Sequence, residues 1–472
     1  MTFATLTPQP RPKNRRKRQN HYNSLYLWFD VLVSSRKSPS MNSSFKWTVV
    51  GSSACVVVLL LLGANSGRAV ATDDVYGHLK VYTEVLEHIK LEYVEEPDMK
   101  SVTLGAINGL LESVDPFASY LNADQYNQFR KTSDTAKAGV GLVLAKRYGY
   151  VAVVDTIPGS PAEKANISTG DLIESINNVA TRDMPLAYAE QLLRGDAGST
   201  IEVSILRLKN PGDPQKMTLT RSVIGVPDIT AKMLPDKVGY LHVSTLESNR
   251  EEQVKSKLAD LKKQGAAYIV LDLRHCSTGD QEKGVPLANL FLDGGEITSL
   301  QGQKTEKKVF DAKSDADVWK GPLVVITDRA TAGGAEIAAA ALLDDKRAQV
   351  VGERSYGDAS LRKTIQMDDG GAVILSVAKY YSPSGKAIQD TGVVPSVAIA
   401  ENDSTQEVDA DGNPLPGTET KSTEDNLLKR SIDLVTGKTT LAQLTADPNG
   451  VETVSVAPAI IEKAPKVISP KQ

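Results

Sequence analysis

The sequence predicts an α/β multidomain protein with a helical N-terminal segment, a β-rich domain and a mixed α/β core. Three observations support this fold class. Apolar residues recur at helical spacing within 72–136, short β-type runs separated by glycines fill 137–222, and apolar strands alternate with amphipathic helices over 223–400. The chain has 472 residues, of which 41% are hydrophobic, and this suffices for two or three domains with real cores.

The charge of the chain gives little indication of a partner. Its formal net charge is -4, so nothing favours nucleic-acid binding or electrostatic steering of an acidic substrate. The one strongly basic stretch, 11–18, lies in the polar segment 1–40. This segment indicates either a disordered tail or an over-long start.

Residues 41–71 are typical of an export signal. Lys46 supplies a positive charge after Met41, 49–62 is mostly apolar, and Ala69-Val70-Ala71 fits a cleavage site. The apolar run of about 14 residues is short for a bilayer-spanning helix of ~20. We therefore expect cleavage after Ala71, with retention as a membrane anchor as the alternative. Either way the protein is expected to be exported, to the periplasm or the extracytoplasmic face of the membrane.

The predicted helical subdomain covers 72–136. One helix is indicated by apolar or aromatic residues that share a face, namely Tyr82, Val85, Leu86 and Ile89. A second helix starts near Ser101 and carries Leu104, Ile107, Leu110 and Leu111. Asp115-Pro116 then interrupts the helical pattern.

The β-rich stretch 137–222 is similar to a PDZ domain. The motifs that carry this resemblance occur in order: Gly139-Val140-Gly141-Leu142-Val143-Leu144, the strand Tyr150 to Val154, Gly159-Ser160-Pro161-Ala162, Gly170-Asp171-Leu172-Ile173, a helix from Ala187 to Arg194 and a closing strand from Ile201 to Arg207. In such a module, glycines let successive N–H groups converge on a carboxylate while an extended peptide adds to a strand edge.

The expected ligand of this module is a protein or peptide with a free, apolar C-terminus. The carboxylate is expected at the backbone of Gly139 to Val143. The pocket wall is expected to consist of Leu142 and Leu144 together with Leu192 or Leu193.

The sequence of residues 223–400 predicts a mostly parallel or mixed sheet with both faces covered. The predicted strands are Gly239 to Val243, Tyr268 to Arg274, Leu323 to Ile326, Gln349 to Val351 and Ala372 to Val377, and the predicted helices are Glu251 to Gln264 and Ala335 to Leu343. Over 401–472 the sequence turns polar, with one helix from Asp425 to Val435 and a partly disordered tail.

Several motifs together resemble the C-terminal processing (tail-specific) peptidase family, over roughly 75–440. They are Asn108-Gly109-Leu110-Leu111, Leu271-Asp272-Leu273-Arg274, Ala335-Glu336-Ile337-Ala338, Val351-Gly352-Glu353 and the run from Tyr380 to Gln389. The resemblance implies a serine endopeptidase that recognises protein C-termini. In this family a neutral lysine activates the serine.

This chain departs from the family at the positions that carry the chemistry. The family's serine, three residues before the glutamate, aligns with Gly333, and its lysine aligns with Asp358. Its aspartate falls on Asp344, and its glutamine after the lysine falls on Arg362. Its oxyanion loop reads His275-Cys276-Ser277-Thr278-Gly279, with Thr278 in place of the first glycine of the pair.

The resulting hypothesis is a degenerate family member, without serine–lysine chemistry, that acts as a peptide-binding adaptor or regulator. The alternative is an active protease with a relocated nucleophile, for which the candidates are Cys276 beside His275, and Thr331, Ser355 or Ser360 with Lys363 as a base. Neither hypothesis needs a particular oligomeric state, and an oligomer is compatible with both.

The two cysteines and five histidines show no metal-ligand spacing, so we expect neither a metal nor another cofactor. Cys55 lies in the apolar run 49–62. The processed protein would then keep Cys276 alone, without an internal disulfide.

Overall fold

The computed structural model describes residues 72–135, 138–182, 184–207, 212–314, 318–399, 425–441 and 443. The expectations for 1–40, for the signal 41–71 and for most of 401–472 lie outside these residues. The chain divides into two compact units after Pro97. Helix α2 (Thr72–Glu92) belongs to the first unit and all later elements to the second, so the predicted subdomain 72–136 is split between the two units.

The second unit begins with α3 (Met99–Glu112), whose start is fixed by a side-chain cap. A carboxylate oxygen of Asp98 accepts a hydrogen bond from the N–H of Lys100 at 3.0 Å, and the other accepts from the hydroxyl of Ser101 at 2.6 Å. The short strand β1 (Ser119–Leu121) and α4 (Ala123–Thr135) follow. The strand was not predicted, because three residues carry no detectable period.

The PDZ-like domain contains a five-stranded antiparallel path, β2-β3-β4-β6-β7, with β5 paired to β4. Its elements are β2 (Leu142–Arg147), β3 (Tyr150–Thr156), α5 (Pro161–Lys164), β4 (Leu172–Ile176), β5 (Val179–Ala180), α6 (Leu186–Leu193), β6 (Thr200–Leu206) and β7 (Gln215–Thr220). The predicted order of strands and helix is confirmed. The first strand begins at Leu142 and not at Gly139, because Gly141 turns the chain with φ +78°.

The α/β core is built on a six-stranded sheet of order β17-β14-β13-β10-β9-β8, which is parallel except for the β8–β9 pair. Its strands are β8 (Thr230–Leu234), β9 (Val238–His242), β10 (Tyr268–Asp272), β13 (Leu323–Thr327), β14 (Gln349–Gly352) and β17 (Val397–Ala398). The helices around it are α7 (Arg250–Lys263), α8 (Gly284–Asn289), α9 (Gly334–Asp344) and α10 (Asn426–Val435).

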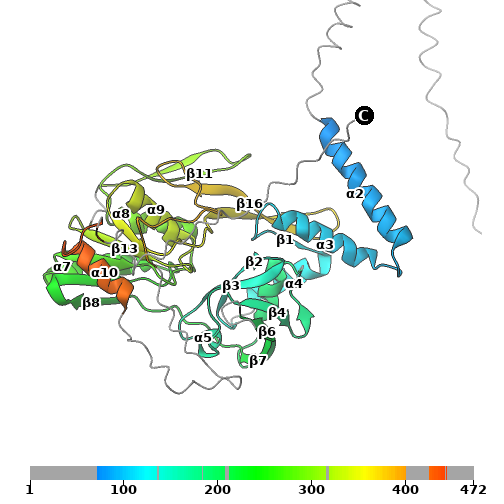
Figure 1. Ribbon diagram of the computed structural model, residues 1–472, viewed down its shortest axis with the longest axis horizontal. Helices are drawn as coiled ribbons and strands as arrows, with labels where there is room; N and C mark the ends of the chain where they lie inside the picture. Colours follow the sequence, from blue (N-terminus) through cyan, green and yellow to red (C-terminus); the bar gives the residue numbers. More distant parts are fainter. Residues whose placement is uncertain are drawn as a thin grey trace, which may run out of the picture. The chain divides into compact units, whose positions relative to one another are not determined.

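Both faces of this sheet are covered, as the sequence predicts. Leu271 and Val325 pack in the cluster that includes residues of α7, α8 and α9, while Val270 and Val324 pack in the cluster that includes residues of α10. Alternation of buried side chains to both faces explains why the strands read as continuous apolar runs. Figure 1 shows these elements, in green to red, beside the strands of the PDZ-like domain, in cyan to green.

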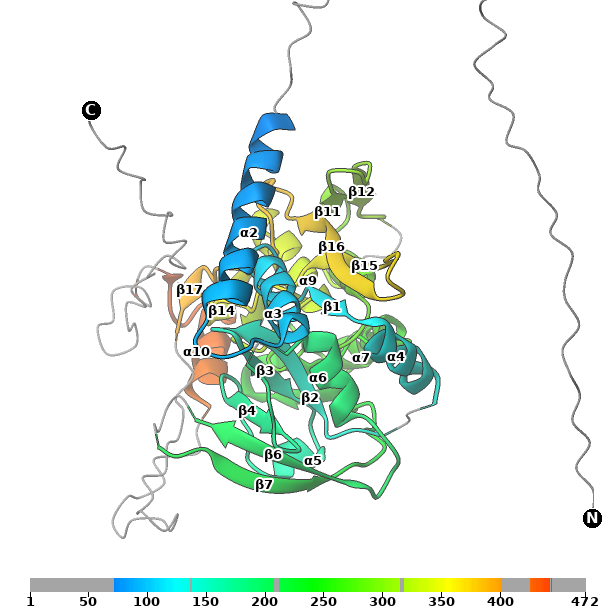
Figure 2. The ribbon, with the colours of Figure 1, turned by 90° about the vertical axis from the view of Figure 1, so that its right-hand side faces the viewer.

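A second, antiparallel sheet of the core was missed by sequence analysis except for part of one strand. Its order is β1-β16-β11-β12, with β15 also paired to β16 (Figure 2). Its strands, besides β1, are β11 (Glu296–Gln301), β12 (Lys308–Asp311), β15 (Ser360–Gln366) and β16 (Ala372–Tyr381). Most side chains of β15 are exposed, and the strand contains few apolar residues. It is therefore stabilised mainly by its pairing with β16. Two single turns of 3₁₀-helix, η1 (Pro235–Lys237) and η2 (Gln281–Lys283), complete the elements of the described chain.

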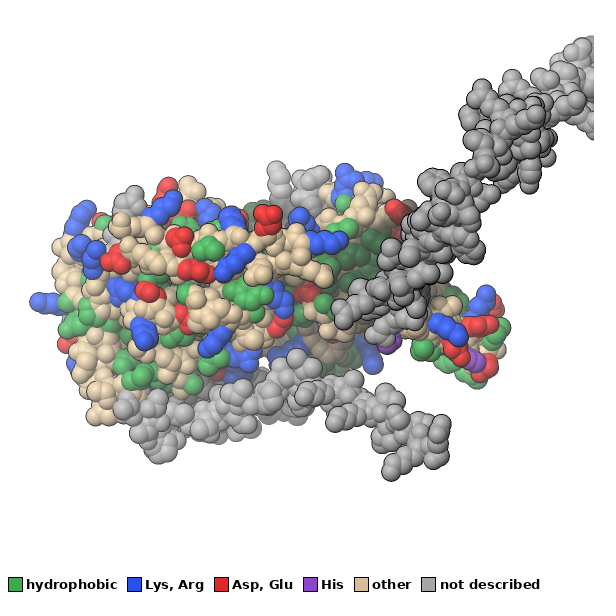
Figure 3. All heavy atoms as spheres, turned by 90° about the horizontal axis from the view of Figure 1, so that it is seen from above, with side chains coloured by type: hydrophobic (Ala, Val, Ile, Leu, Met, Phe, Trp, Pro, Cys, Tyr) green, Lys and Arg blue, Asp and Glu red, His purple; other side chains and the backbone are tan. Residues whose placement is uncertain are grey.

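On the face drawn in Figure 3, Lys and Arg side chains are interspersed with Asp and Glu side chains, as the small net charge suggests. Within the described ranges, no helix has the length and apolar character needed to cross a bilayer.

Close contact between α8 and α9 depends on glycine. A Cβ atom at Gly284 would lie 2.0 Å from the carbonyl oxygen of Gly334, a backbone atom at the start of α9 that cannot rotate away. This contact brings η2 and α8 against the turn that precedes α9.

We predict that Gly284→Ala lowers the free energy of unfolding by about 1–3 kcal/mol, because the added methyl group overpacks a rigid contact. Gly294→Ala is the matched control, since a Cβ at Gly294 meets nothing within 4 Å. It should change stability by less than about 0.5 kcal/mol. Urea unfolding followed by circular dichroism measures both, and equal midpoints for the two variants would contradict the close contact.

Candidate functional site

The turn between β13 and α9 has a strained backbone. Gly333, the residue before α9, has φ 62° and ψ -120°. Strained strand-to-helix turns present the nucleophile in α/β-hydrolases. A Cβ at Gly333 would meet the carbonyl oxygen of Asp358 at 3.5 Å and Cγ of Gln281 at 3.6 Å, which are ordinary contacts. The turn therefore has room for a side chain that this chain does not supply.

Glu336 ties this turn to the segment that contains the lysine-aligned position. Its buried carboxylate accepts hydrogen bonds from the N–H of Gly333 at 2.9 Å, the hydroxyl of Ser355 at 2.5 Å, the N–H of Gly357 at 2.7 Å and the N–H of Asp358 at 2.7 Å. Burial raises the pKa of Glu336 to about 7, although these donors favour the ionised form. The carboxylate holds Gly333 and Asp358 next to each other.

Asp358 and Arg362, which the sequence analysis aligned with the family's lysine and glutamine, form an ion pair. The guanidinium carbon of Arg362 also lies 4.1 Å from the centre of the Phe117 ring, a cation–π contact. Burial raises the pKa of Asp358, and nearby Asp115 acts in the same direction, while Arg362 opposes the shift. Each of the two substituted side chains therefore supplies the counter-charge of the other.

The loop that aligns with the family's oxyanion loop is fixed to the segment after β9. The hydroxyls of Thr278 and Thr245 are 2.7 Å apart, and the N–H of Leu246 donates to the carbonyl oxygen of Thr278 at 2.9 Å. Gly279 has φ +112°, and a Cβ there would lie 2.5 Å from the carbonyl carbon of Leu246. Gly279 thus keeps a conformation that only glycine adopts readily, whereas Thr278 is held by its own side chain.

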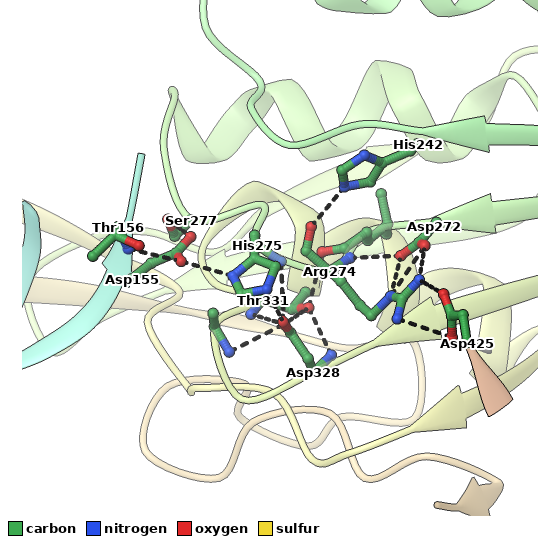
Figure 4. A network of polar contacts seen from close by, with 12 residues as sticks. Asp155, Thr156, His242, Asp272, Arg274, His275, Ser277, Asp328, Thr331 and Asp425 are labelled. Carbon is green, nitrogen blue, oxygen red and sulfur yellow. Dashed lines mark hydrogen bonds and ion pairs between the residues drawn. The ribbon is translucent and has the colours of Figure 1, made fainter. Parts of the chain in front are cut away.

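His275 and Cys276, the proposed thiol–imidazole pair, are directed to different surroundings. His275 Nδ1 lies 2.9 Å from a carboxylate oxygen of Asp155, and Nε2 lies 3.6 Å from one of Asp328. Figure 4 shows the ring between these two buried carboxylates, Asp155 on β3 and Asp328 after β13. The Cys276 side chain is buried in the apolar core, and this burial raises the pKa of its thiol.

The hydroxyl candidates are occupied by structural hydrogen bonds. Thr331, fully buried, donates to the carbonyl oxygen of Leu273 or to the carboxylate of Asp328 at 2.9 and 2.8 Å. Ser355 donates to Glu336, and the hydroxyl of Ser360 lies 2.9 Å from that of Ser376. Lys363, the suggested base, is exposed on β15.

Asp344 does not join this site. It is the last residue of α9, about 15 Å along the helix axis from its start. There it accepts a hydrogen bond from the N–H of Ser384 at 3.0 Å. Burial disfavours the charged form, but hydrogen bonds from Ser382 and Ser384 and the charge of Lys386 outweigh it and lower the pKa of Asp344. Its position favours a structural role.

The PDZ-like domain contains a groove of about 260 Å³ that most of the predicted binding residues line. The predicted residues that line it are Gly139, Val140, Gly141, Leu142, Leu144 and Leu193; Val143 and Leu192 are not among its lining residues and pack against the domain core. A single strand edge with a glycine turn at its start is the arrangement that peptide addition requires.

Not every predicted amide of this loop is available. The N–H of Gly139 donates to the carbonyl oxygen of Ser222 at 3.0 Å. The carbonyl oxygens of Val140 and Gly141 accept bonds from Ala162 and Ile157, while their own N–H groups donate to no acceptor among the described residues. Fewer N–H groups are therefore available to a ligand carboxylate than the predicted set from Gly139 to Val143.

Sequence analysis missed five groove residues: Ala138, Ile157, Glu190, Arg194 and Ile224. Glu190 and Arg194 could have been found, because residues three and four apart on a helix share a face and Leu193 was already assigned to the groove. Ile157 and Ile224 come from outside the predicted motif, and no local pattern marks them. Over the residues that the structure describes, no group of three or more His, Cys, Asp or Glu side chains could hold a metal ion.

Comparison with known proteins agrees with this organisation. Residues 237–399 match the model of peptidase family S41, and residues 153–207 match a PDZ domain. The C-terminal processing peptidase of Tetradesmus obliquus chloroplasts is 30% identical over 322 residues, which cover 65% of this chain and 69% of that protein. The carboxy-terminal-processing protease of Bartonella bacilliformis is 29% identical over 347 residues, covering 72% of this chain and 80% of that protein.

A solved structure supports the same assignment of the fold. The photosystem II D1 C-terminal processing protease superposes with a TM-score of 0.56 at 29% identity, over 67% of this chain and 86% of that chain. The predicted combination of a PDZ domain with a peptidase-like α/β core is thus confirmed.

The raised pKa of Glu336 predicts a pH dependence of stability. The folded protein keeps the proton up to about pH 7, whereas the unfolded chain releases it near the usual glutamate pKa of 4.5. The stability that this proton contributes is full below about pH 4.5 and is lost as the pH rises through 7, by about 3 kcal/mol.

Glu336→Gln should remove this dependence, because an amide does not titrate in this range. The measurement is the difference in unfolding free energy between wild type and variant from pH 5 to 8. The exposed Glu306→Gln is the control and should leave the pH profile unchanged. A constant difference between wild type and Glu336→Gln across this range would contradict the assignment.

Proposed function

This chain belongs to the C-terminal processing peptidase family, within peptidase family S41, and we propose that it retains peptide recognition through its PDZ domain but lacks the serine–lysine chemistry of that family. It would act as an adaptor or regulator that binds protein C-termini. The single observation that carries this proposal is the strained turn at Gly333, the position that the family resemblance aligns with the serine, where no side chain is present.

The base position supports the same conclusion. A general base must accept a proton from the nucleophile, and the family's lysine does so in its neutral form. Asp358 is a carboxylate paired with Arg362; burial raises its pKa and Arg362 opposes this rise, but a carboxylate remains a much weaker base than a neutral amine. Even with a serine at Gly333, these residues would provide a weak proton acceptor.

The geometry of the other candidates favours a degenerate copy over a relocated nucleophile. A catalytic cysteine needs an accessible thiolate, and Cys276 is buried with a raised thiol pKa. Thr331 and Ser360 are buried, and their hydroxyl groups bond within the core to Leu273, Asp328 and Ser376, none of which is a histidine or lysine base. These observations support the adaptor.

The location of the protein is part of the proposal. The apolar run 49–62 and the site at Ala69-Val70-Ala71 support export, with either a released or a membrane-anchored product. Ligands would then be the C-termini of exported proteins.

We predict that a peptide with a free, apolar C-terminus binds at least about tenfold more tightly than its amidated form, because the amide removes the charge that strengthens hydrogen bonds from Val140 and Gly141. Fluorescence anisotropy with a labelled peptide measures both affinities. Equal affinity for the acid and amide forms would contradict the proposal.

Gly141→Ala tests the same site. A Cβ at this position would lie 2.2 Å from Cβ of Ser160, so the variant should no longer bind the acid peptide. Gly149→Ala is its control. Gly149 has a similar φ of +80° in the same domain, but a Cβ there meets nothing within 4 Å. This variant should bind the acid peptide as wild type does.

We also predict that the wild-type protein does not cleave an unfolded substrate such as casein. Gly333→Ser alone should gain nothing, and Gly333→Ser with Asp358→Lys should gain little, because Arg362 then faces a second cation and Thr278 still constrains the oxyanion loop. The variant that also carries Thr278→Gly and Arg362→Gln should show the largest gain.

The control for this series is the unmodified protein after extensive purification. Cleavage that persists and then disappears in Cys276→Ala or Ser360→Ala would show a relocated nucleophile and refute the adaptor.

A further inference from the structure

The C-terminal end of α6 lies beside the glycine turn of the groove. The N–H of Gly195, directly after α6, donates to the carbonyl oxygen of Ala138 at 3.1 Å, and the two residues form an isolated bridge. A Cβ at Gly139 would lie 3.8 Å from the carbonyl oxygen of Leu193. A carboxylate bound at Val140 and Gly141 would therefore lie near the last turn of this helix.

Two charged side chains of α6 and its C-cap line an otherwise largely apolar groove. Glu190 and Arg194 are four residues apart and so share one helix face. Among the described residues neither side chain forms a hydrogen bond or an ion pair, and they do not pair with each other. Glu190 is half-buried, whereas Arg194 is exposed.

Besides Arg194, two further cations near this part of the groove are held by other partners. Arg362 pairs with Asp358 and lies on Phe117. Arg221 donates to the carbonyl oxygens of Leu192 and Leu193 at 2.8 and 3.2 Å. Glu190 thus has a partly desolvated carboxylate without a bonded counter-ion, which is unfavourable unless a ligand supplies one.

The ionisation of Glu190 agrees with this geometry. Burial raises its pKa, and the charge of Asp358 acts in the same direction, while Arg194 and Arg362 oppose the shift without cancelling it. A cation bound in the groove would favour the ionised form of Glu190.

The spacing of the two charges matches an added strand. Four residues of helix advance about 6 Å. Two residues of an extended peptide advance about 6.7 Å, and residues two apart project to the same side. If the last residue of the ligand lies at the Arg194 end, the side chain two residues earlier lies opposite Glu190.

We propose that this groove selects peptides that end in an apolar residue with a free carboxylate and carry Lys or Arg two residues before the C-terminus, with Glu190 as the partner of that cation and Arg194 beside the carboxylate. The inference rests on the proposed function, since it assigns the ligand class of the same groove. It makes Glu190 the specificity-determining residue and leaves the apolar contacts to Leu142, Leu144 and Leu193.

The test uses the full chain and three fluorescein-labelled peptides that end in Lys-Ala-Leu, Ala-Ala-Leu or Glu-Ala-Leu, all with a free carboxylate. Wild-type protein should bind the lysine peptide most tightly and the glutamate peptide most weakly, with about a tenfold difference between the two. Glu190→Gln, which is nearly isosteric, should bind the lysine and alanine peptides equally. Glu190→Lys should reverse the order.

Glu202→Lys provides the same charge change on β6, outside the groove, and should keep the wild-type order. Equal binding of the three peptides to wild type, with the acid form still preferred over the amide, would refute the role of Glu190 while the proposed function stands. The same holds if Glu190→Gln keeps the lysine preference or if Glu202→Lys abolishes it. Equal affinities for the acid and amide forms of the peptide would refute the proposed function. They would also refute the assignment of Glu190, which depends on anchoring of the ligand carboxylate.

Discussion

The buried carboxylate of Glu336 is the interaction on which the candidate site depends. It accepts four hydrogen bonds, one from Gly333 at the start of α9 and three from the segment 355–358. A single side chain thereby holds the turn after β13 against the strand-joining loop that precedes β15. The strained backbone of Gly333 persists without a nucleophile because these bonds, and the contact between Gly284 and Gly334, fix it independently of any side chain at that position.

The substitutions around this site compensate one another. Reversing the charge at the lysine-aligned position would leave a partly buried carboxylate unpaired, which is costly. Arg362 supplies the counter-charge and is itself held over Phe117. The two side chains thus balance each other's charge at this position.

Two of the contacts between the PDZ domain and the core lie near the candidate site at Gly333 and Asp358. At one place Asp155 of β3 binds His275 and Ser277 (Figure 4). At the other, Phe117 packs edge-on against Tyr356, with ring centres 5.9 Å apart, and Tyr356 packs against the PDZ core. The Asp358–Arg362 pair is therefore close enough to influence the ionisation of Glu190 in the groove.

The sequence by itself determined the local elements and the identity of the substituted positions. Strands β9, β10, β13 and β14 and helices α7 and α9 agree with the predicted ranges to within one or two residues at most ends, because periodicity is a local property of the chain. Motif spacing alone located Gly333 and Asp358, and the structure brings them together through Glu336.

Only the tertiary structure decided which distant residues meet. Strand β15 is mostly exposed and is recognisable only through its pairing with β16, and β1 is too short to show a period. Asp344 lies at the far end of α9, and His275 turns toward Asp155 because its backbone has a positive φ. Among the described residues Glu190 forms no ion pair, while Arg362 pairs with Asp358. Pairing, burial and charge compensation depend on neighbours in space, which local sequence patterns do not specify.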